Sequence, residues 1–345
     1  MALGRWVGAL ALIGAVAVPV GVTTPTQAAS FDCAKASTPY EQAICQQPKL
    51  SAADELLAKA FSTAIGGLTA KAADAMRTDQ RQWLDFVQRV CTDDAKPLTS
   101  GSYDDTGASC LADKLRDRVN VLEASRMLGG HRFYLTTSYS AQPDPDEVDN
   151  PESYWKVTSH EFSAPLVDSD DALAAKFNAF ITTALKGDDD LGASEFDDQS
   201  TDGMSFTVVK SVTTTRISVE TTGYSYPHGA AHGGGSLGNL HYLIGEDRAL
   251  TAADVFKGGA WQEKLTDLVI AQLNTNVGEW LQMPDRSTLT AIISMPARWS
   301  FEDPYGLTIQ FQQYEVGPYA YGMPTVTISW ENLNDVTADS LAALQ

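Results

Sequence analysis

Residues 204–244 read MSFTVVKSVTTTRISVETTGYSYPHGAAHGGGSLGNLHYLI and carry the clearest structural signal in the chain. Three of its segments, 204–211, 216–226 and 237–244, are rich in Val, Ile, Thr, Phe and Tyr, the residues favoured in β-strands. Short runs of Thr or Gly separate these segments, as expected of turns. The stretch therefore predicts neighbouring strands of one sheet, mainly antiparallel.

The rest of the C-terminal two thirds interleaves strands with helices. Apolar spacing predicts two helices, at 172–185 and 261–281. Interleaving without a regular strand–helix–strand repeat is typical of an α+β domain, which we place at 131–345. The further strands that we expect in this domain are 132–140, 154–164, 307–312 and 325–330.

The N-terminal third predicts a small helical domain at 30–128. Apolar residues recur at helical spacing in three segments, 51–64, 76–90 and 111–122. The segment 93–109 is rich in Asp, Ser, Thr, Gly and Pro, which favours a loop. Three amphipathic helices around one apolar seam form a bundle, so the whole chain is expected to be α+β with a helical N-terminal domain.

All four cysteines, Cys33, Cys45, Cys91 and Cys110, fall in that helical third. In an oxidising compartment they are expected to form two disulfides, for which three pairings exist. We favour Cys33–Cys45 and Cys91–Cys110, because each pair brackets one short loop. A zinc site is the competing interpretation, but this third contains no Cys-x-x-Cys and no His.

Residues 1–29 have the pattern of a signal peptide. Arg5 precedes an apolar run at 6–22, and small residues at Thr26 and Ala28 fit a cleavage site. We expect cleavage and a secreted or periplasmic protein without stable membrane insertion, although an uncleaved anchor is the alternative. Cys33 does not follow a lipoprotein cleavage motif, so we expect no lipid anchor.

The charge balance restricts the partners. The chain of 345 residues has 24 Lys and Arg against 44 Asp and Glu, a formal charge of −20. Such an excess repels nucleic-acid phosphates and attracts cationic partners over long range. The hydrophobic fraction of 43% is ordinary for a globular protein, so the acidity does not indicate a disordered chain.

The first third contains an ordered set of residues that resembles a known family. The set is Phe31-Asp32-Cys33, Glu41, Ile44-Cys45, Pro48, Leu50-Ser51, Asp54, Gln80-Arg81, Trp83-Leu84, Arg89, Cys91, Cys110-Leu111 and Arg118. In this order it resembles the N-terminal domain of the LprI-type lysozyme inhibitors, over about 31–122. The resemblance implies a lysozyme-facing module, here without the lipoprotein motif.

The second block also carries the residues of a resemblance. They are Tyr226-Pro227-His228-Gly229-Ala230-Ala231-His232, Asn239, Leu250-Thr251, Asp254-Val255-Phe256, Phe311, Tyr314-Glu315-Val316, Pro318-Tyr319-Ala320 and Gly322. Over about 131–330 the block resembles the extracellular domain of the anti-sigma factor RsiV, which is similar to the non-catalytic domain of the deacetylase PdaC. In the anti-sigma relatives this domain recognises lysozyme. We expect neither deacetylase activity nor sigma-factor signalling here.

The segment YEVGPYAYGM, residues 314–323, is the candidate partner-binding loop. Tyrosines on a loop shaped by Pro and Gly bring large contact area and a hydroxyl group at low ordering entropy. The alternative is that these tyrosines pack under the sheet of their own domain. The candidate binding residues are Tyr314, Glu315, Pro318, Tyr319 and Tyr321.

His228 and His232 are weak candidates for metal ligands. They are four residues apart, and His241 lies near in sequence, so a zinc site is conceivable. Against it, Gly233-Gly234-Gly235 favours a loop and no Glu follows His228 as in a metalloprotease helix. We expect a glycine-rich turn with structural imidazoles, no metal and no cofactor.

These observations predict a non-enzymatic binding protein of the cell envelope that recognises and inhibits lysozyme-type muramidases by occluding their active-site cleft. The sequence contains no Gly-x-Ser-x-Gly, nucleotide-binding loop or catalytic Cys/His arrangement. The alternative is a module that binds peptidoglycan directly, as a cell-wall accessory or sensor. A zinc-dependent hydrolase ranks third.

Overall fold

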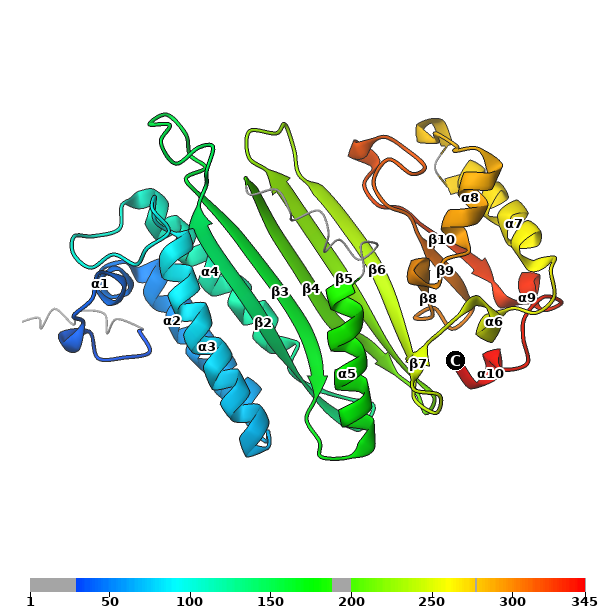
Figure 1. The fold of residues 1–345 in the computed structure, drawn as a ribbon, viewed down its shortest axis with the longest axis horizontal. Helices are drawn as coiled ribbons and strands as arrows, with labels where there is room; N and C mark the ends of the chain where they lie inside the picture. The colour runs from blue at the N-terminus through cyan, green and yellow to red at the C-terminus, as the bar shows by residue number, and fades with distance from the viewer. Residues whose placement is uncertain (1–28, 188–199, 277, 345) are drawn as a thin grey trace, which may run out of the picture.

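The computed structural model describes residues 29–187, 200–276 and 278–344. The predicted signal peptide, apart from Ala29, lies outside these residues. The N-terminal region is helical and lies at one end of an elongated molecule (Figure 1). Among the described residues no helix is both long and apolar enough to cross a bilayer. The elements of this region are η1 (Cys33–Lys35), α1 (Pro39–Gln46), α2 (Pro48–Ile65), α3 (Ala70–Val90) and α4 (Asp105–Glu123).

The start of α4 differs from the sequence prediction. Residues 93–109 were expected to form a loop, but the helix begins at Asp105, so Cys110 lies inside it. The reason is the side chain of Asp104, which accepts a hydrogen bond from the Gly107 backbone at 2.8 Å and caps the helix. A stretch rich in Asp, Ser and Gly thus contains a helix start as well as a loop.

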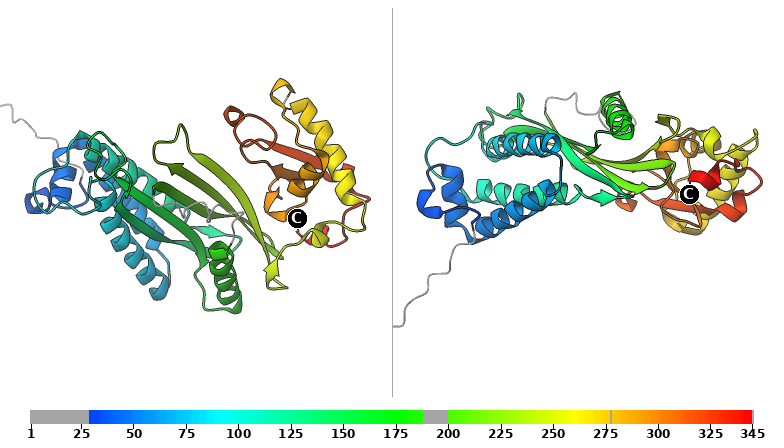
Figure 2. Two further views of the ribbon diagram at one scale, coloured as in Figure 1. Left: turned by 45° about the horizontal axis from the view of Figure 1, so that its top comes forward. Right: turned by 90° about the horizontal axis from the view of Figure 1, so that it is seen from below.

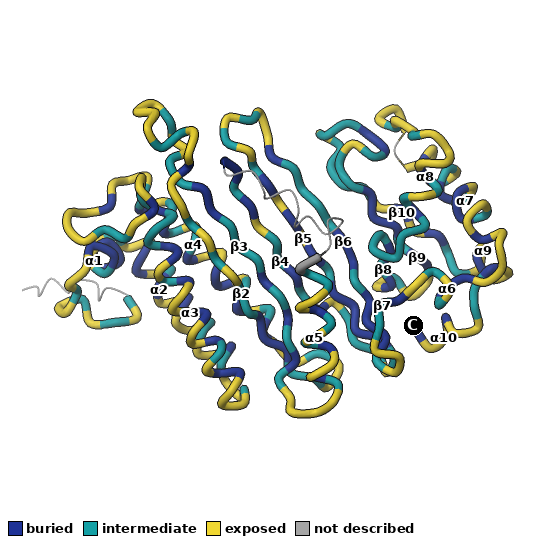
Figure 3. Tube along the Cα trace, viewed as in Figure 1, coloured by how far each residue is buried: buried dark blue, intermediate teal, exposed yellow. Residues whose placement is uncertain are grey.

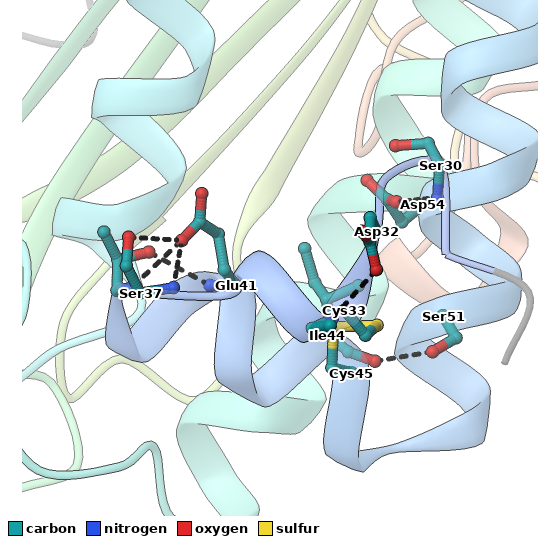
Figure 4. Close-up of a disulfide and its surroundings, with 11 residues drawn as sticks. Ser30, Asp32, Cys33, Ser37, Glu41, Ile44, Cys45, Ser51 and Asp54 are labelled. Atoms are coloured by element: carbon teal, nitrogen blue, oxygen red, sulfur yellow. Dashed lines mark hydrogen bonds between the residues drawn. A yellow bond between two sulfur atoms is a disulfide. The ribbon is translucent and has the colours of Figure 1, made fainter.

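Both predicted disulfides are confirmed. Cys33 is bonded to Cys45, and Cys91 at the end of α3 is bonded to Cys110 in α4. Figure 4 shows the first bond beside the hydrogen bond from the Ser51 hydroxyl to the Ile44 carbonyl, at 2.6 Å. The first disulfide therefore links the short turn η1 to the short helix α1.

The centre of the molecule is a seven-stranded sheet in sequential order. Strands β3 and β4 are parallel, and every other neighbouring pair is antiparallel. Helix α5 (Ala172–Gly187) makes the connection between the parallel pair. The mainly antiparallel α+β fold is therefore confirmed. The strands are β1 (Met127–Leu128), β2 (His131–Pro143), β3 (Val157–Val167), β4 (Thr201–Val212), β5 (Arg216–Pro227), β6 (Gly234–Leu243) and β7 (Arg248–Ala249).

The two faces of this sheet have different surroundings. Helix α5 covers one face, where Phe177 packs with Ile217 and Val219 in a buried cluster (Figure 2). Alternate residues of β5 point to the other face, so Tyr224 lies there beside its β4 neighbour Met204. These two side chains are 43% and 48% exposed, so this face is open at that place.

The helical region shares its core with the sheet. Tyr134 of β2 belongs to the helical core, and Tyr139 packs against Phe86 of α3 with ring centroids 5.2 Å apart. Asp79 of α3 pairs with Arg118 of α4 in the interior and also accepts a hydrogen bond from the Thr137 backbone, at 2.8 Å. The edge of β2 is therefore covered by the helices. The predicted domain boundary, between 128 and 131, falls in the β1–β2 turn.

The C-terminal region has a core of its own around a second sheet of order β10-β9-β8. The helix predicted at 261–281 ends at Asn276, and a separate short turn follows. The elements are α6 (Ala252–Val255), α7 (Trp261–Asn276), η4 (Gly278–Trp280), α8 (Arg286–Ile293), η5 (Pro296–Arg298), β8 (Trp299–Ser300), β9 (Gly306–Gln310), η6 (Tyr319–Tyr321), β10 (Thr325–Ser329), α9 (Trp330–Leu333) and α10 (Leu341–Leu344).

Candidate functional site

The predicted binding loop lies between β9 and β10 and is attached to the edge of β6. The Gln312 amide accepts from the Leu237 backbone N–H at 2.9 Å and donates to the Leu237 carbonyl at 2.7 Å. Gln313 accepts from the Gly235 N–H at 2.9 Å. Strand β7 pairs only with the far end of β6, so these side chains satisfy backbone groups that would otherwise form an open sheet edge. The structure thus brings the segments 228–235 and 312–323 together.

Tyr314 is the exposed tyrosine of this loop, at 61%. Its backbone has a φ of 66°, in the left-handed region that a bulky residue rarely adopts. Such a conformation costs on the order of 1–3 kcal/mol and persists only where surrounding contacts enforce it. Its hydroxyl lies 3.3 Å from Nε2 of His232. Of the predicted binding residues, Tyr314 is the one that projects most into solvent.

Tyr319 and Tyr321 are half-buried, and both hydroxyls contact backbone carbonyls of the same chain. The ring of Tyr319 stacks on His232 with centroids 3.9 Å apart, and its hydroxyl donates to the Gly233 carbonyl at 2.9 Å. The hydroxyl of Tyr321 lies 3.5 Å from the Asn276 carbonyl, and its ring packs against the C-terminal core. These contacts fix the loop and leave less of both residues for a partner.

Glu315 and Pro318 shape the loop. The Glu315 carboxylate accepts from Arg298 at 2.9 Å and from the Gln312 backbone at 2.6 Å, and it is 18% exposed. Pro318 is the residue immediately before η6, the short helical turn of Tyr319 to Tyr321. The ion pair and the proline together define the conformation in which Tyr314 is presented.

His228 lies in a polar cluster that sequence spacing did not indicate. Its side chain is 1% exposed; Nδ1 contacts the buried Asp144 carboxylate, and Nε2 lies 3.3 Å from Asp202. Burial opposes ionisation of Asp144, but hydrogen bonds from His228, Ser200 and two backbone N–H groups outweigh it and lower the pKa of that carboxyl. No local sequence motif predicts this cluster, because Asp144 and His228 are 84 residues apart in the chain.

The other two candidate histidines, His232 and His241, also form hydrogen bonds within the chain. Nδ1 of His232 lies 3.0 Å from the Gly233 carbonyl, a contact of the kind expected for a structural turn. His241 is buried between the Ser218 hydroxyl and the Trp299 carbonyl, each 2.8 Å from a ring nitrogen. Burial, and next the Arg216 guanidinium, lower the pKa of His241 to about 3. Within the described residues, no group of three His, Cys, Asp or Glu side chains is arranged to hold a metal ion.

Two family models match separate segments of the chain. Residues 33–122 match the family described as "Lysozyme inhibitor LprI". Residues 253–331 match the family described as "Protein of unknown function (DUF3298)". The chain carries an LprI region followed by a DUF3298 region. The match to LprI contains all four cysteines that form the two disulfides.

Curated relatives share the N-terminal similarity. The proteins named "Lipoprotein LprI" of Mycobacterium bovis and of two strains of Mycobacterium tuberculosis are each 30% identical over 100 residues, which is 28% of this chain and 49% of theirs. The chain therefore spans about half the length of these relatives.

Solved structures of the DUF3298 family are similar at low identity. A protein from Pseudomonas aeruginosa PAO1 is 15% identical and has a TM-score of 0.43. The aligned region covers 63% of this chain and 98% of that protein's chain. A member from Bacteroides fragilis is 16% identical, covers 62% and 96%, and has a TM-score of 0.44.

Proposed function

We propose that this is an exported, non-enzymatic protein that binds lysozyme-type muramidases and inhibits them. The observation that carries the proposal is the match of residues 33–122 to the LprI lysozyme inhibitor family. The resemblance of the second block to the lysozyme-recognising domain of RsiV supports the same partner. Two regions of one chain thus point to one kind of target.

The charge of the molecule favours this partner. Lysozymes are basic proteins, and the formal charge here is −20. Attraction between opposite net charges raises the rate of encounter and is weakened by salt. We therefore expect the association rate with a basic lysozyme to fall as ionic strength rises.

Occlusion of the cleft is the inhibitory step in this proposal. Tyr314 is exposed on a loop that Gln312, Gln313 and the Glu315–Arg298 pair hold in place. A fixed loop loses little entropy on binding, which favours insertion of its aromatic side chain where a saccharide ring would lie. No covalent bond is formed or broken in this step, so we expect inhibition to be reversible by dilution.

The test is the rate at which a basic lysozyme clears a suspension of bacterial cell walls. We expect the purified protein at molar excess and low salt to suppress clearing, and Tyr314→Ala to suppress it at least tenfold less effectively. Tyr305→Ala is the matched control, because Tyr305 is 81% exposed in the turn between β8 and β9. An unchanged clearing rate with the wild-type protein would reject inhibition.

A sedimentation assay on insoluble peptidoglycan separates the alternative. The proposal predicts that the protein stays in the supernatant when lysozyme is absent. Retention on peptidoglycan without any effect on lysozyme would instead favour the wall-binding function.

A further inference from the structure

The 312–323 loop alone is too small to hold a partner stably. A fully buried tyrosine contributes roughly 150–250 Å², whereas a specific protein interface buries roughly 800 Å² on each partner. Tyr319 and Tyr321 are already half-buried within the chain. If the proposed function holds, on which this inference rests, further surface next to Tyr314 has to take part.

Exposed aromatic and apolar side chains continue from this loop across the end of the sheet. We call them the aromatic rim: Tyr154, Trp155, Met204, Tyr224 and Tyr314. Their exposed fractions are 91%, 36%, 48%, 43% and 61%, so the rim holds five of the ten large hydrophobic side chains that are exposed among the described residues. Scattered single residues of this kind are common on surfaces, but a contiguous group marks an interaction site.

Contacts at one end of the rim connect the sheet to the loop between β2 and β3. The ring of Trp155 lies 6.2 Å from that of Tyr226, and Tyr226 lies on the same face of β5 as Tyr224. Tyr224 in turn is the cross-strand neighbour of Met204. These residues therefore form one strip on the face of the sheet opposite α5. Figure 2 shows the face that α5 covers.

At the other end, Gly233 connects the strip to Tyr314. A β-carbon at Gly233 would collide with the Tyr224 hydroxyl, so the two lie in close contact. The Gly233 carbonyl accepts a hydrogen bond from the Tyr319 hydroxyl. The ring centroids of Tyr319 and Tyr314 are 5.6 Å apart. The β2–β3, β5–β6 and β9–β10 connections, which lie beside or within the rim, are on the same long edge of the molecule (Figure 1).

The loop of residues 144–156 is ordered by its own hydrogen bonds, although most of its residues are exposed or partly exposed (Figure 3). The Lys156 ammonium donates to the carbonyls of Glu147, Val148 and Asn150. The buried Asp144 accepts from backbone groups of the loop and contacts His228. Tyr154 and Trp155 are therefore displayed on a preorganised support, which lowers the entropy lost on binding.

The charge of this loop selects a basic partner. It contains five carboxylates, of which Asp146, Asp149 and Glu152 are exposed, while its lysine is turned inward to backbone carbonyls. Carboxylates around apolar anchors complement a surface rich in Arg and Lys. A neutral saccharide would not experience the long-range charge attraction that these carboxylates exert on a basic protein.

We propose that the aromatic rim is the main docking surface for the basic lysozyme, with Tyr154 and Tyr224 as anchors on either side of Trp155 and Met204. The partner then covers the end of the sheet from the 144–156 loop to Tyr314. Insertion of Tyr314 is one contact of a wider interface.

Equilibrium dissociation constants of the purified protein for a basic C-type lysozyme test the aromatic part. We expect Tyr154→Ala and Tyr224→Ala each to weaken binding at least tenfold, and Tyr305→Ala to change it less than twofold. The Tyr154 side chain is 91% exposed, so its removal is not expected to unfold the protein. Unchanged affinity in both rim variants would overturn the proposal.

Charge reversal tests the acidic part when the compared variants change the net charge by the same amount. We expect Asp149→Lys and Glu152→Lys each to weaken lysozyme binding more than Glu331→Lys, which makes the same change on α9, outside the rim. Equal effects of all three would mean that only the net charge matters, and would contradict a local acidic contact.

The wild-type protein separates failure of the rim from failure of the proposed function. If it binds no lysozyme, both fail. If it binds and the rim variants bind equally well, the proposed function stands, the rim is excluded, and the helical region is left as the binding surface. Loss of peptidoglycan binding alone in the rim variants would also overturn the proposal.

Discussion

His241 shows how one buried side chain sets a pH limit on the fold. Because the Trp299 carbonyl only accepts, Nε2 carries the hydrogen and Nδ1 accepts from the Ser218 hydroxyl, so the neutral ring is fully satisfied. Its pKa of about 3 lies well below the value near 6.5 of an unfolded histidine. Between these values the unfolded chain takes up a proton that the folded protein does not.

This difference predicts a pH-dependent stability. Stability from neutral His241 is fully present above pH 6.5 and is lost as pH falls toward 3, by about 1.4 kcal/mol per unit. Urea unfolding of the wild type and of His241→Gln at pH 7.5, 6 and 5 measures it. We expect the difference in unfolding free energy between the two proteins to shrink with decreasing pH. A constant difference would show that His241 does not control this dependence.

At the scale of elements, the attachment of the binding loop to β6 is the feature to test. Gln312 and Gln313 take the place of a strand along the outer edge of β6 through their side-chain amides. We expect Gln312→Ala to speed amide hydrogen exchange at Leu237 at least tenfold, because its N–H loses the acceptor. Exchange at Leu240, which lies deeper in the β5–β6 pairing, is the internal control. Equal protection at Leu237 in both proteins would contradict the attachment.

Elements with strong local patterns could be predicted from the sequence. The strand expected at 216–226 is β5, Arg216–Pro227, because its β-branched and aromatic residues lie between clear turns. The start of α4 was missed because Asp104 caps a helix within a stretch of loop-forming residues. The disulfide pairing followed from short separations, of 12 and 19 residues.

The polar cluster around His228 and the rim could not be predicted in the same way. Asp144, Asp202 and His228 meet only when three distant segments of the sheet come together. The sequence predicted a strand at 154–164 that included Tyr154 and Trp155, but β3 begins only at Val157. No local pattern indicated that Lys156 turns inward or that Trp155 stacks near His228. Long-range contacts of this kind depend on the tertiary fold and leave no local periodicity.

At the scale of the whole molecule, the buried pair of Asp79 and Arg118 joins the helical region to the sheet. The two side chains are 5% and 2% exposed, and Arg118 also donates to the Tyr139 hydroxyl at 2.7 Å. Removal of one member leaves a buried charge without its partner, which typically costs about 3–5 kcal/mol.

We therefore expect Asp79→Ala to lower the free energy of unfolding in urea at pH 7 by about 3–5 kcal/mol. The control is Asp113→Ala, which breaks an exposed pair with Arg116 on α4 and is expected to cost less than about 1 kcal/mol. Similar effects of the two variants would argue that the helical region and the sheet are not coupled through this pair.

In the proposed function, this acidic, non-catalytic protein forms a specific complex with a basic muramidase. Isothermal titration of a C-type lysozyme with the purified protein at low and at physiological ionic strength measures this directly. We expect a saturable complex that weakens as salt is added and that still forms at physiological ionic strength. An absence of saturable binding at low salt, where electrostatic attraction is strongest, would contradict it.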